Sequence, residues 1–138
     1  MSKTTESDIY KLIKKAVVNL KLNCHLTRVE SGLTLSGIPD LYIAYHSNLI
    51  NKSIAFWLEI KSNNLKNCNV SKYQFNWILK HNKLGGVAYI LNRPVTEGGL
   101  KLYRVDPCSV VTEVLSTDYS VTGIANVFEW VAKKHCIA

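Results

Sequence analysis

The spacing of hydrophobic residues along the chain predicts three helices. In residues 5–22 apolar side chains recur every three or four positions, which is typical of an amphipathic helix. Residues 71–81 show the same periodicity and begin with Ser71 and Gln74 in the spacing of a capping box. Residues 124–135 form a third apolar stripe that ends in Lys133 and Lys134. We therefore expect helices near the start, in the middle and at the end of the chain.

Shorter segments rich in β-branched and aromatic residues predict strands between these helices. They are residues 25–30, 33–35, 41–46, 53–61, 87–91 and 100–105. Ser31-Gly32 and Ser36-Gly37 interrupt the first two segments, and the asparagine-containing residues 47–52 favour a β-hairpin. The resulting order, α, β-β-β, α, β, β, α, predicts a mixed α/β fold around one sheet.

Composition limits the class of protein. A chain of 138 residues with 47% hydrophobic and 20% charged residues is typical of one globular domain, residues 1–138, and excludes a disordered or fibrous chain. No apolar run approaches the roughly 18 residues of a membrane helix, and the first residues lack a hydrophobic signal region. We expect a cytoplasmic protein with no membrane partner. The four cysteines are widely spaced without a CxxC pair, so we expect reduced, mostly buried thiols.

The charge balance favours a polyanionic partner. Seventeen Lys and Arg residues against ten Asp and Glu residues give a formal net charge of +7. Nucleic acid is the first expectation for such a chain, and a membrane surface is the second. The lysines that would contact phosphates, unless they are simply solvated surface, are Lys14, Lys15, Lys21, Lys52, Lys66, Lys72, Lys80 and Lys83.

Two carboxylates are predicted to face each other across the hairpin. If the hairpin closes symmetrically about Leu49 and Ile50, paired residue numbers sum to 99, and Asp40 lies opposite Glu59 with Cβ atoms about 5 Å apart. Two such acids repel each other, but their oxygens can share one divalent cation such as Mg²⁺. Strand alternation places Lys61 on the same face as Glu59. The alternatives are turn chemistry for Asp40 and an exposed ion pair between Glu59 and Lys61.

A third acid and an amide complete the set of candidate residues. Glu6 is heptad-spaced with Ile13 and Leu20 and would face the sheet, although in a first turn it could merely complement the helix dipole. Glu30, at a strand end, is the other candidate for the third acid. Gln74 could contact the site, or it could serve only as the partner of the helix cap.

Three motifs carry a resemblance to a known family. Gly37-Ile38-Pro39-Asp40, then Trp57-Leu58-Glu59-Ile60-Lys61, then Ser71 and Gln74 resemble the PD-(D/E)XK nuclease superfamily. The pattern is most similar to the virus-type replication-repair nuclease (VRR-NUC) domains and to archaeal and phage Holliday-junction resolvases. The resemblance implies a restriction-endonuclease-like αβββαβ core over about residues 5–92, with a mixed sheet flanked by helices. A C-terminal strand and helix would lie in the extension, about residues 93–138.

The resemblance also implies roles for the candidate residues. The metal, Mg²⁺ or in its place Mn²⁺, would be held by Asp40, Glu59 and the backbone carbonyl of Ile60, with Glu6 as the additional acid. Lys61 would orient or activate the attacking water and offset the charge of the phosphate. Gln74 would contact the site or the substrate.

The implied function is that of a metal-dependent, structure-specific endodeoxyribonuclease. Such an enzyme hydrolyses phosphodiester bonds in branched DNA, and a Holliday-junction resolvase acting in recombination and repair is the leading expectation. A homodimer would match the two-fold symmetry of a four-way junction. We expect it in a bacterial or archaeal cell, or encoded by a virus. The alternatives are a repair or restriction-like nuclease on flap, nicked or duplex DNA, and a non-catalytic nucleic-acid-binding module with the same fold.

Overall fold

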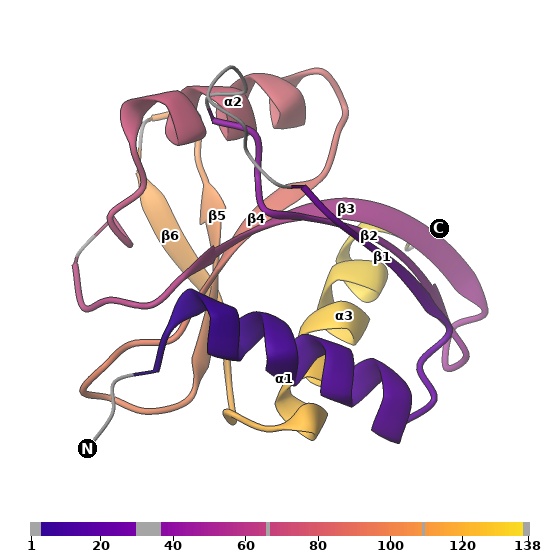
Figure 1. Ribbon diagram of the computed structural model, residues 1–138. Coiled ribbons are helices and arrows are strands. Elements are labelled where there is room, and N and C mark those ends of the chain that lie inside the picture. The colour runs from indigo at the N-terminus through magenta and orange to yellow at the C-terminus, as the bar shows by residue number, and fades with distance from the viewer. Residues whose placement is uncertain (1–3, 30–36, 66, 109, 137–138) are drawn as a thin grey trace.

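The computed structural model describes residues 4–29, 37–65, 67–108 and 110–136. These residues form three helices and one six-stranded sheet (Figure 1). The elements are α1 (Glu6–Asn19), β1 (Cys24–Arg28), β2 (Leu41–Ser47), β3 (Lys52–Lys61), α2 (Lys72–Lys83), β4 (Ala88–Asn92), β5 (Leu100–Val105), β6 (Val111–Thr117) and α3 (Val121–His135). The strands lie in sequence order, β3 and β4 run parallel, and the other neighbours are antiparallel. The predicted mixed α/β fold around one sheet is therefore confirmed.

The helices cover the two faces of the sheet unequally. α1 and α3 pack together on one face, here called the inner face, and α2 packs on the opposite, outer face, where it contacts β4 and β5 (Figure 1). The main core lies on the inner face, and a smaller cluster around Ile78 lies under α2. Because helices cover both sides of β4, all five of its residues are buried.

The hairpin has the register that the sequence predicts. Paired residues run from Leu41 opposite Leu58 to Ser47 opposite Lys52, so the residue numbers of each pair sum to 99. Along β2, the side chains at odd positions are buried in the inner core, and those at even positions point to the outer face. This alternation decides which side chains near the hairpin can reach α2.

The C-terminal region differs from the prediction in one element. The sequence pattern predicts no strand after residue 105, but Val111–Thr117 forms the edge strand β6, which pairs with β5. Its residues are half-buried or exposed without alternation, so the pattern that marks a two-sided strand is absent. α3 begins at Val121, three residues before the predicted start, with Ser120 as its cap.

The predicted apolar stripe of α1 is wrong at its end. Ile9, Ile13 and Ala16 are buried, but Leu20 is 41% exposed because the helix ends at Asn19. The expected extended segment at residues 33–35 lies outside the described residues.

α3 packs on the sheet of its own domain. Its apolar side, which includes Val127, Phe128 and Val131, is fully buried in the inner core. Glu129 accepts hydrogen bonds from the hydroxyl groups of Tyr45 and Ser47, which joins the helix to β2.

The cysteine thiols are free, as expected, but only one of them is buried. Cys68 is buried, Cys24 and Cys136 are half-buried, and Cys108 is exposed. Among the described residues, no helix is both long and apolar enough to cross a membrane.

Candidate active site

A glycine brings the loop before β2 against α2. Gly37 has φ +90°, and a Cβ atom at this position would lie 2.4 Å from the carbonyl oxygen of Tyr73 in the first turn of α2. Glycine therefore meets two demands here, a left-handed backbone and a close backbone approach. The consequence is that the Gly37-Ile38-Pro39-Asp40 motif passes directly beside the start of α2.

Asp40 is fixed by the neighbouring strand rather than by its own turn. It lies one residue before β2, just beyond the last paired position, and its Oδ2 accepts a hydrogen bond of 2.8 Å from the backbone N–H of Ile60. Its backbone carbonyl accepts another from Val29. Local turn chemistry therefore does not account for this side chain, because its carboxylate reaches across to β3.

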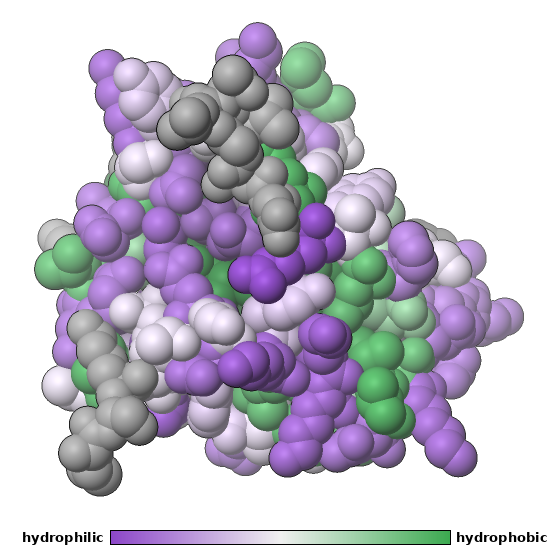
Figure 2. Space-filling view, in the orientation of Figure 1, coloured by the Kyte–Doolittle hydropathy of each residue, from purple (hydrophilic) through white to green (hydrophobic). Residues whose placement is uncertain are grey.

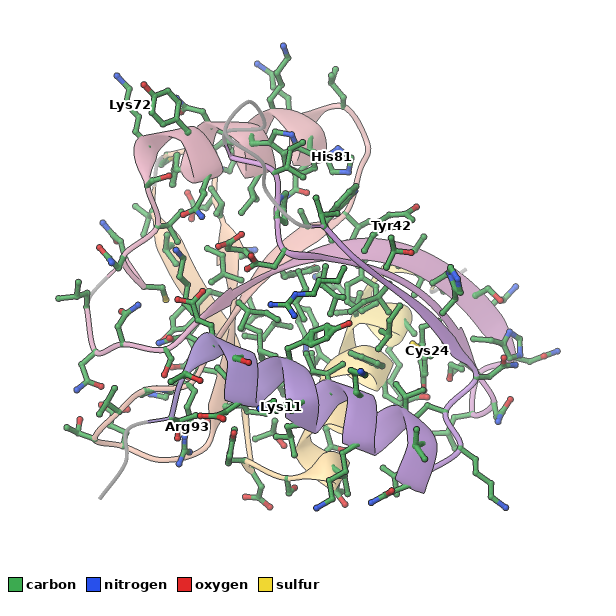
Figure 3. The ribbon with its side chains drawn as sticks, viewed as in Figure 1. Lys11, Cys24, Tyr42, Lys72, His81 and Arg93 are labelled. Carbon is green, nitrogen blue, oxygen red and sulfur yellow. The ribbon has the colours of Figure 1, made fainter. Side chains whose placement is uncertain are left out.

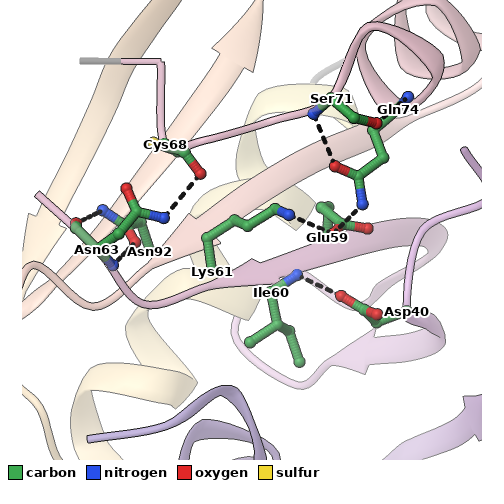
Figure 4. A network of polar contacts seen from close by, with 9 residues as sticks. All are labelled: Asp40, Glu59, Ile60, Lys61, Asn63, Cys68, Ser71, Gln74 and Asn92. Atoms are coloured by element: carbon green, nitrogen blue, oxygen red, sulfur yellow. Dashed lines mark hydrogen bonds and ion pairs between the residues drawn. The ribbon is translucent and has the colours of Figure 1, made fainter. Parts of the chain in front are cut away.

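Glu59 is a buried carboxylate with one unpaired oxygen. Its residue is 2% exposed, and it lies on the outer face near the end of β3. Its Oε2 accepts a hydrogen bond of 2.9 Å from Nε2 of Gln74 and lies 3.5 Å from Nζ of Lys61 (Figure 4). Its Oε1 is buried and has no hydrogen-bond partner among the described residues. A buried carboxylate oxygen without a donor is costly, and a bound cation would relieve that cost.

The protonation of Glu59 reflects these surroundings. Burial raises the pKa of Glu59 to about 8, and the negative charge of Asp40 adds to this rise, whereas the positive charge of Lys61 opposes it. The positive charge of Lys61 is thus too weak to hold the pKa of this carboxyl at its ordinary value. The two carboxylates and their surroundings fit a divalent cation, which would favour the ionised form of both acids.

Gln74 has both of the roles that the sequence left as alternatives. Its Oε1 accepts a hydrogen bond from the backbone N–H of Ser71, and its own backbone N–H donates to the hydroxyl of Ser71, which completes the capping box. Its Nε2 donates to Glu59. A single amide can do both because its oxygen and nitrogen point to different partners.

Lys61 lies beside Glu59 on the same face, as strand alternation predicts. The side chains of Lys61 and Glu59 are 12% and 2% exposed, which contradicts the alternative of an exposed ion pair. The backbone beyond Lys61 is held by Asn92, whose side chain exchanges two hydrogen bonds with the backbone of Asn63. Sequence reasoning missed Asn92, although an asparagine that ends a fully apolar strand is a usable signal.

Glu6 lies close enough to Asp40 and Lys61 for their charges to shift its pKa. Its residue is exposed in the first turn of α1, where partial burial raises its pKa, the charge of Lys61 lowers it and the charge of Asp40 raises it. The start of α1 is joined to the end of β3 because the hydroxyl of Ser62 donates to the carbonyl of Thr4. The alternative third acid, Glu30, lies outside the described residues.

The described side chains alone do not supply a full set of metal ligands. Within residues 4–29, 37–65, 67–108 and 110–136, no group of three or more His, Cys, Asp or Glu side chains is arranged to hold a metal. Ile60 buries its side chain in the inner core while its backbone N–H binds Asp40. A cation at this place would thus be held by two carboxylates, with backbone and water oxygens completing its shell.

Comparison with known proteins assigns no family. A scan against protein-family models finds no match for this chain, and a search of curated proteins finds none either. The arrangement of Asp40, Glu59, Lys61 and Gln74 is therefore the basis for assigning a function.

Exposed lysines lie on both sides of the acids. Hydrophilic side chains cover much of the face on which α1 lies (Figure 2). The candidate phosphate-binding lysines that the structure describes are all exposed: Lys14, Lys15, Lys21, Lys52, Lys72, Lys80 and Lys83. Lys66 lies outside the described residues. Since α1 and α2 flank the sheet, their lysines could approach a polyanion from both sides of the site.

Proposed function

We propose that this protein is a Mg²⁺-dependent endodeoxyribonuclease of the PD-(D/E)XK type, which hydrolyses phosphodiester bonds in branched DNA. One observation carries the proposal: Glu59 is buried beside Asp40 and Lys61 with its Oε1 unpaired. Buried like charges disfavour folding, so a perturbed acid of this kind marks a candidate functional site. DNA hydrolysis by two carboxylates and a lysine is the chemistry that fits this set best.

The two acids would be the metal ligands. Asp40, Glu59 and the backbone carbonyl of Ile60 would hold Mg²⁺, with Mn²⁺ as a substitute and Glu6 as a further acid. A bound divalent cation supplies a water of lowered pKa and polarises the phosphoryl oxygen. The unpaired Oε1 of Glu59 supports this assignment because it is an acceptor that no protein donor occupies.

Lys61 and Gln74 would act on either side of the acids. The ammonium group of Lys61, 3.5 Å from Glu59, could donate to the scissile phosphate and orient the attacking water. Gln74 is a positioning residue, because its amide holds Oε2 of Glu59 and leaves Oε1 open for a ligand. The Ser71 cap in turn holds the amide of Gln74.

The substrate we favour is a four-way junction, cut by a homodimer. Exposed lysines on α1 and α2 would contact phosphates, and such contacts position DNA without reading its sequence. A two-fold dimer would match the symmetry of the junction. Recombination and repair in the cytoplasm of a bacterial or archaeal cell, or of a cell infected by a virus that encodes the protein, are the processes that such an enzyme serves.

The first test is a cleavage assay on defined DNA structures. End-labelled four-way junction, flap and linear duplex are each incubated with the protein in Mg²⁺ and in EDTA. We expect symmetric nicks in the junction, in Mg²⁺ only. Asp40→Asn and Glu59→Gln should abolish cleavage and leave junction binding intact or tighter. The matched control is Glu113→Gln, which neutralises an exposed glutamate on β6 that pairs with Lys101.

Each of the other possible results would change the proposed function. Cutting of flaps or duplex instead of the junction would keep the nuclease and change its role to repair or restriction. Binding without cutting, in Mg²⁺ and in Mn²⁺, would make the protein a non-catalytic nucleic-acid-binding module. Normal cleavage by Asp40→Asn or Glu59→Gln would reject the site itself.

A further inference from the structure

The outer face of β2 and β3 carries an uncharged strip that begins at the two acids. Between the two acids and the hairpin turn, this face is made of three successive cross-strand pairs. They are Tyr42–Trp57, Ala44–Ala55 and His46–Ser53, and together they are called the open strip here. On β1, Thr27 and His25 extend the same face. α2 touches the strip only at Trp57 and otherwise packs farther along the sheet on β4 and β5, so no described helix covers the rest of it (Figure 1).

The end of the open strip nearest the acids is a supported aromatic surface. The ring of Tyr42 lies 4.7 Å from that of Trp57, and the ring of Trp57 lies 5.4 Å from that of Trp77 on α2. His81 stacks on Trp77 at 4.7 Å. Figure 3 shows Tyr42 and His81 on the same side of the sheet as α2. Tyr42 is 36% exposed at the end of this row, so a further ring could stack on it without rearranging the others.

The middle of the open strip is hollow. An open, shallow depression with about 450 Å³ of space lies over Ala44 and Ala55. His25, His46 and Ser53 line it, and the last two lie within hydrogen-bonding distance of each other. Small residues on the floor and hydrogen-bonding groups on the walls suit a flat heterocycle with polar edges.

The absence of charge on this face is informative about its ligand. The side chains of the open strip, together with Thr27 and His25, include no Lys, Arg, Asp or Glu, although the chain carries a net charge of +7. The exposed Arg28 and Lys52 of these strands pair with inner-face positions instead. Unpaired bases bind by stacking on aromatic rings, and sites for single strands combine such rings with cations that contact the backbone. The lysines of α1 and α2 remain available for the backbone.

We propose that the open strip binds unpaired nucleotides adjacent to the phosphate that is cut. The first unpaired base stacks on Tyr42, and the next enters the hollow over Ala44 and Ala55. This inference rests on the proposed nuclease only for the position of the phosphate at the acids. It narrows the substrate to branched DNA that offers unpaired nucleotides, either as a single-stranded arm or as strands that splay apart at the branch point of a four-way junction, and it disfavours continuous duplex.

The test measures binding without cleavage, so it is independent of the nuclease assay. The protein in EDTA is titrated against a flap, a single strand and a duplex of equal length, by fluorescence anisotropy. A 2-aminopurine at the first unpaired position reports stacking. We expect tighter binding of the flap than of the duplex, and quenching of the 2-aminopurine. Tyr42→Ala should weaken flap binding about tenfold and abolish the quenching, whereas Tyr42→Phe should retain both.

Two further variants separate the open strip from general effects. Ala44→Leu fills the hollow at an exposed position without removing an aromatic ring, and it should weaken flap binding but not duplex binding. Tyr73→Ala removes another exposed tyrosine, on α2 and outside the aromatic row, and should change neither.

Three results would overturn the proposal. The first is equal affinity for flap and duplex that Tyr42→Ala leaves unchanged. The second is unchanged flap binding by Ala44→Leu. The third is a dimer, measured by light scattering, that Ala44→Leu dissociates, because the open strip would then be an interface between copies of this chain. Stacking without any cleavage would leave the binding site standing and reject only the proposed nuclease.

Discussion

The buried carboxyl group of Glu59 makes stability depend on pH in a way that one substitution should remove. In Glu59→Gln an amide replaces the carboxyl group with nearly the same shape. The hydrogen bond from Gln74 can persist, since the new side chain still offers an oxygen. The difference in unfolding free energy between the two proteins therefore isolates the protonation of this one group.

The sign follows from the direction of the shift. The pKa of Glu59 is about 8 in the folded protein against an ordinary 4.5, so the folded protein holds a proton that the unfolded chain has released. Its contribution to stability is complete below pH 4.5 and is lost as the pH rises to about 8. The interval spans about 3.5 pH units, and at about 1.4 kcal/mol per unit the loss is at most about 5 kcal/mol.

The assay is urea unfolding followed by tryptophan fluorescence, in EDTA, at several pH values from 5 to 8. The stability of the native sequence should fall across this range relative to Glu59→Gln, so that the variant becomes the more stable protein at pH 8. Every other ionisable group is common to the two proteins, so its contribution cancels in the difference. Added Mg²⁺ at pH 8 should stabilise the native sequence, by about 2.7 kcal/mol at a hundredfold excess over its Kd, and should leave Glu59→Gln nearly unchanged.

Parallel stability curves would refute this reasoning. If the difference between the two proteins stays constant within about 0.5 kcal/mol from pH 5 to pH 8, Glu59 titrates as an ordinary carboxyl, and its burial has no electrostatic consequence. Glu113→Gln serves as the control, because it makes the same chemical change at an exposed glutamate on β6, far from Asp40.

Four further substitutions test how the site and the fold around it are held. Ser71→Ala removes the cap alone and should cost about 1 kcal/mol of unfolding free energy with cleavage retained, whereas Gln74→Ala should also lower kcat, measured on labelled DNA. Gly37→Ala should destabilise by more than about 1 kcal/mol in urea unfolding and lower cleavage, because it places a Cβ against α2 at positive φ. Gly123→Ala should lower Tm with kcat unchanged at permissive temperature, since its Cβ would lie 1.7 Å from the carbonyl oxygen of Asp118.

The sequence predicted the hairpin well because two independent patterns agree there. The alternation of β2 decides which face is buried, and the short asparagine-containing turn decides the register, so a slip by one residue would have exposed Leu41 and Ile43. The alternation along β3 likewise predicts that Lys61 lies beside Glu59. Local patterns of this kind are sufficient to predict the register and the buried face wherever one face of a strand is buried and the other is not.

Other features depend on tertiary contacts that no local pattern contains. β6 is a strand because it pairs with β5, whereas its own residues show no alternation that would predict one. The burial of Glu59 depends on α2, which lies across the outer face and brings Gln74 to it. Leu20 shares the spacing of the buried residues of α1, but it lies past the end of that helix and is exposed.

The position of Glu59 is set by contacts that do not depend on a metal. Gly37 brings the loop before β2 against α2, Asp40 bonds to the backbone of β3, and Gln74 links α2 back to Glu59. These contacts, made between segments distant in sequence, hold the two carboxylates near each other. An apolar or amide residue in place of Glu59 would make the fold more stable, since a buried acid beside another acid opposes folding. Stability alone therefore does not explain why a glutamate is at this position. We propose that the unpaired Oε1 binds a ligand, and a divalent cation there would also relieve the repulsion between the two acids.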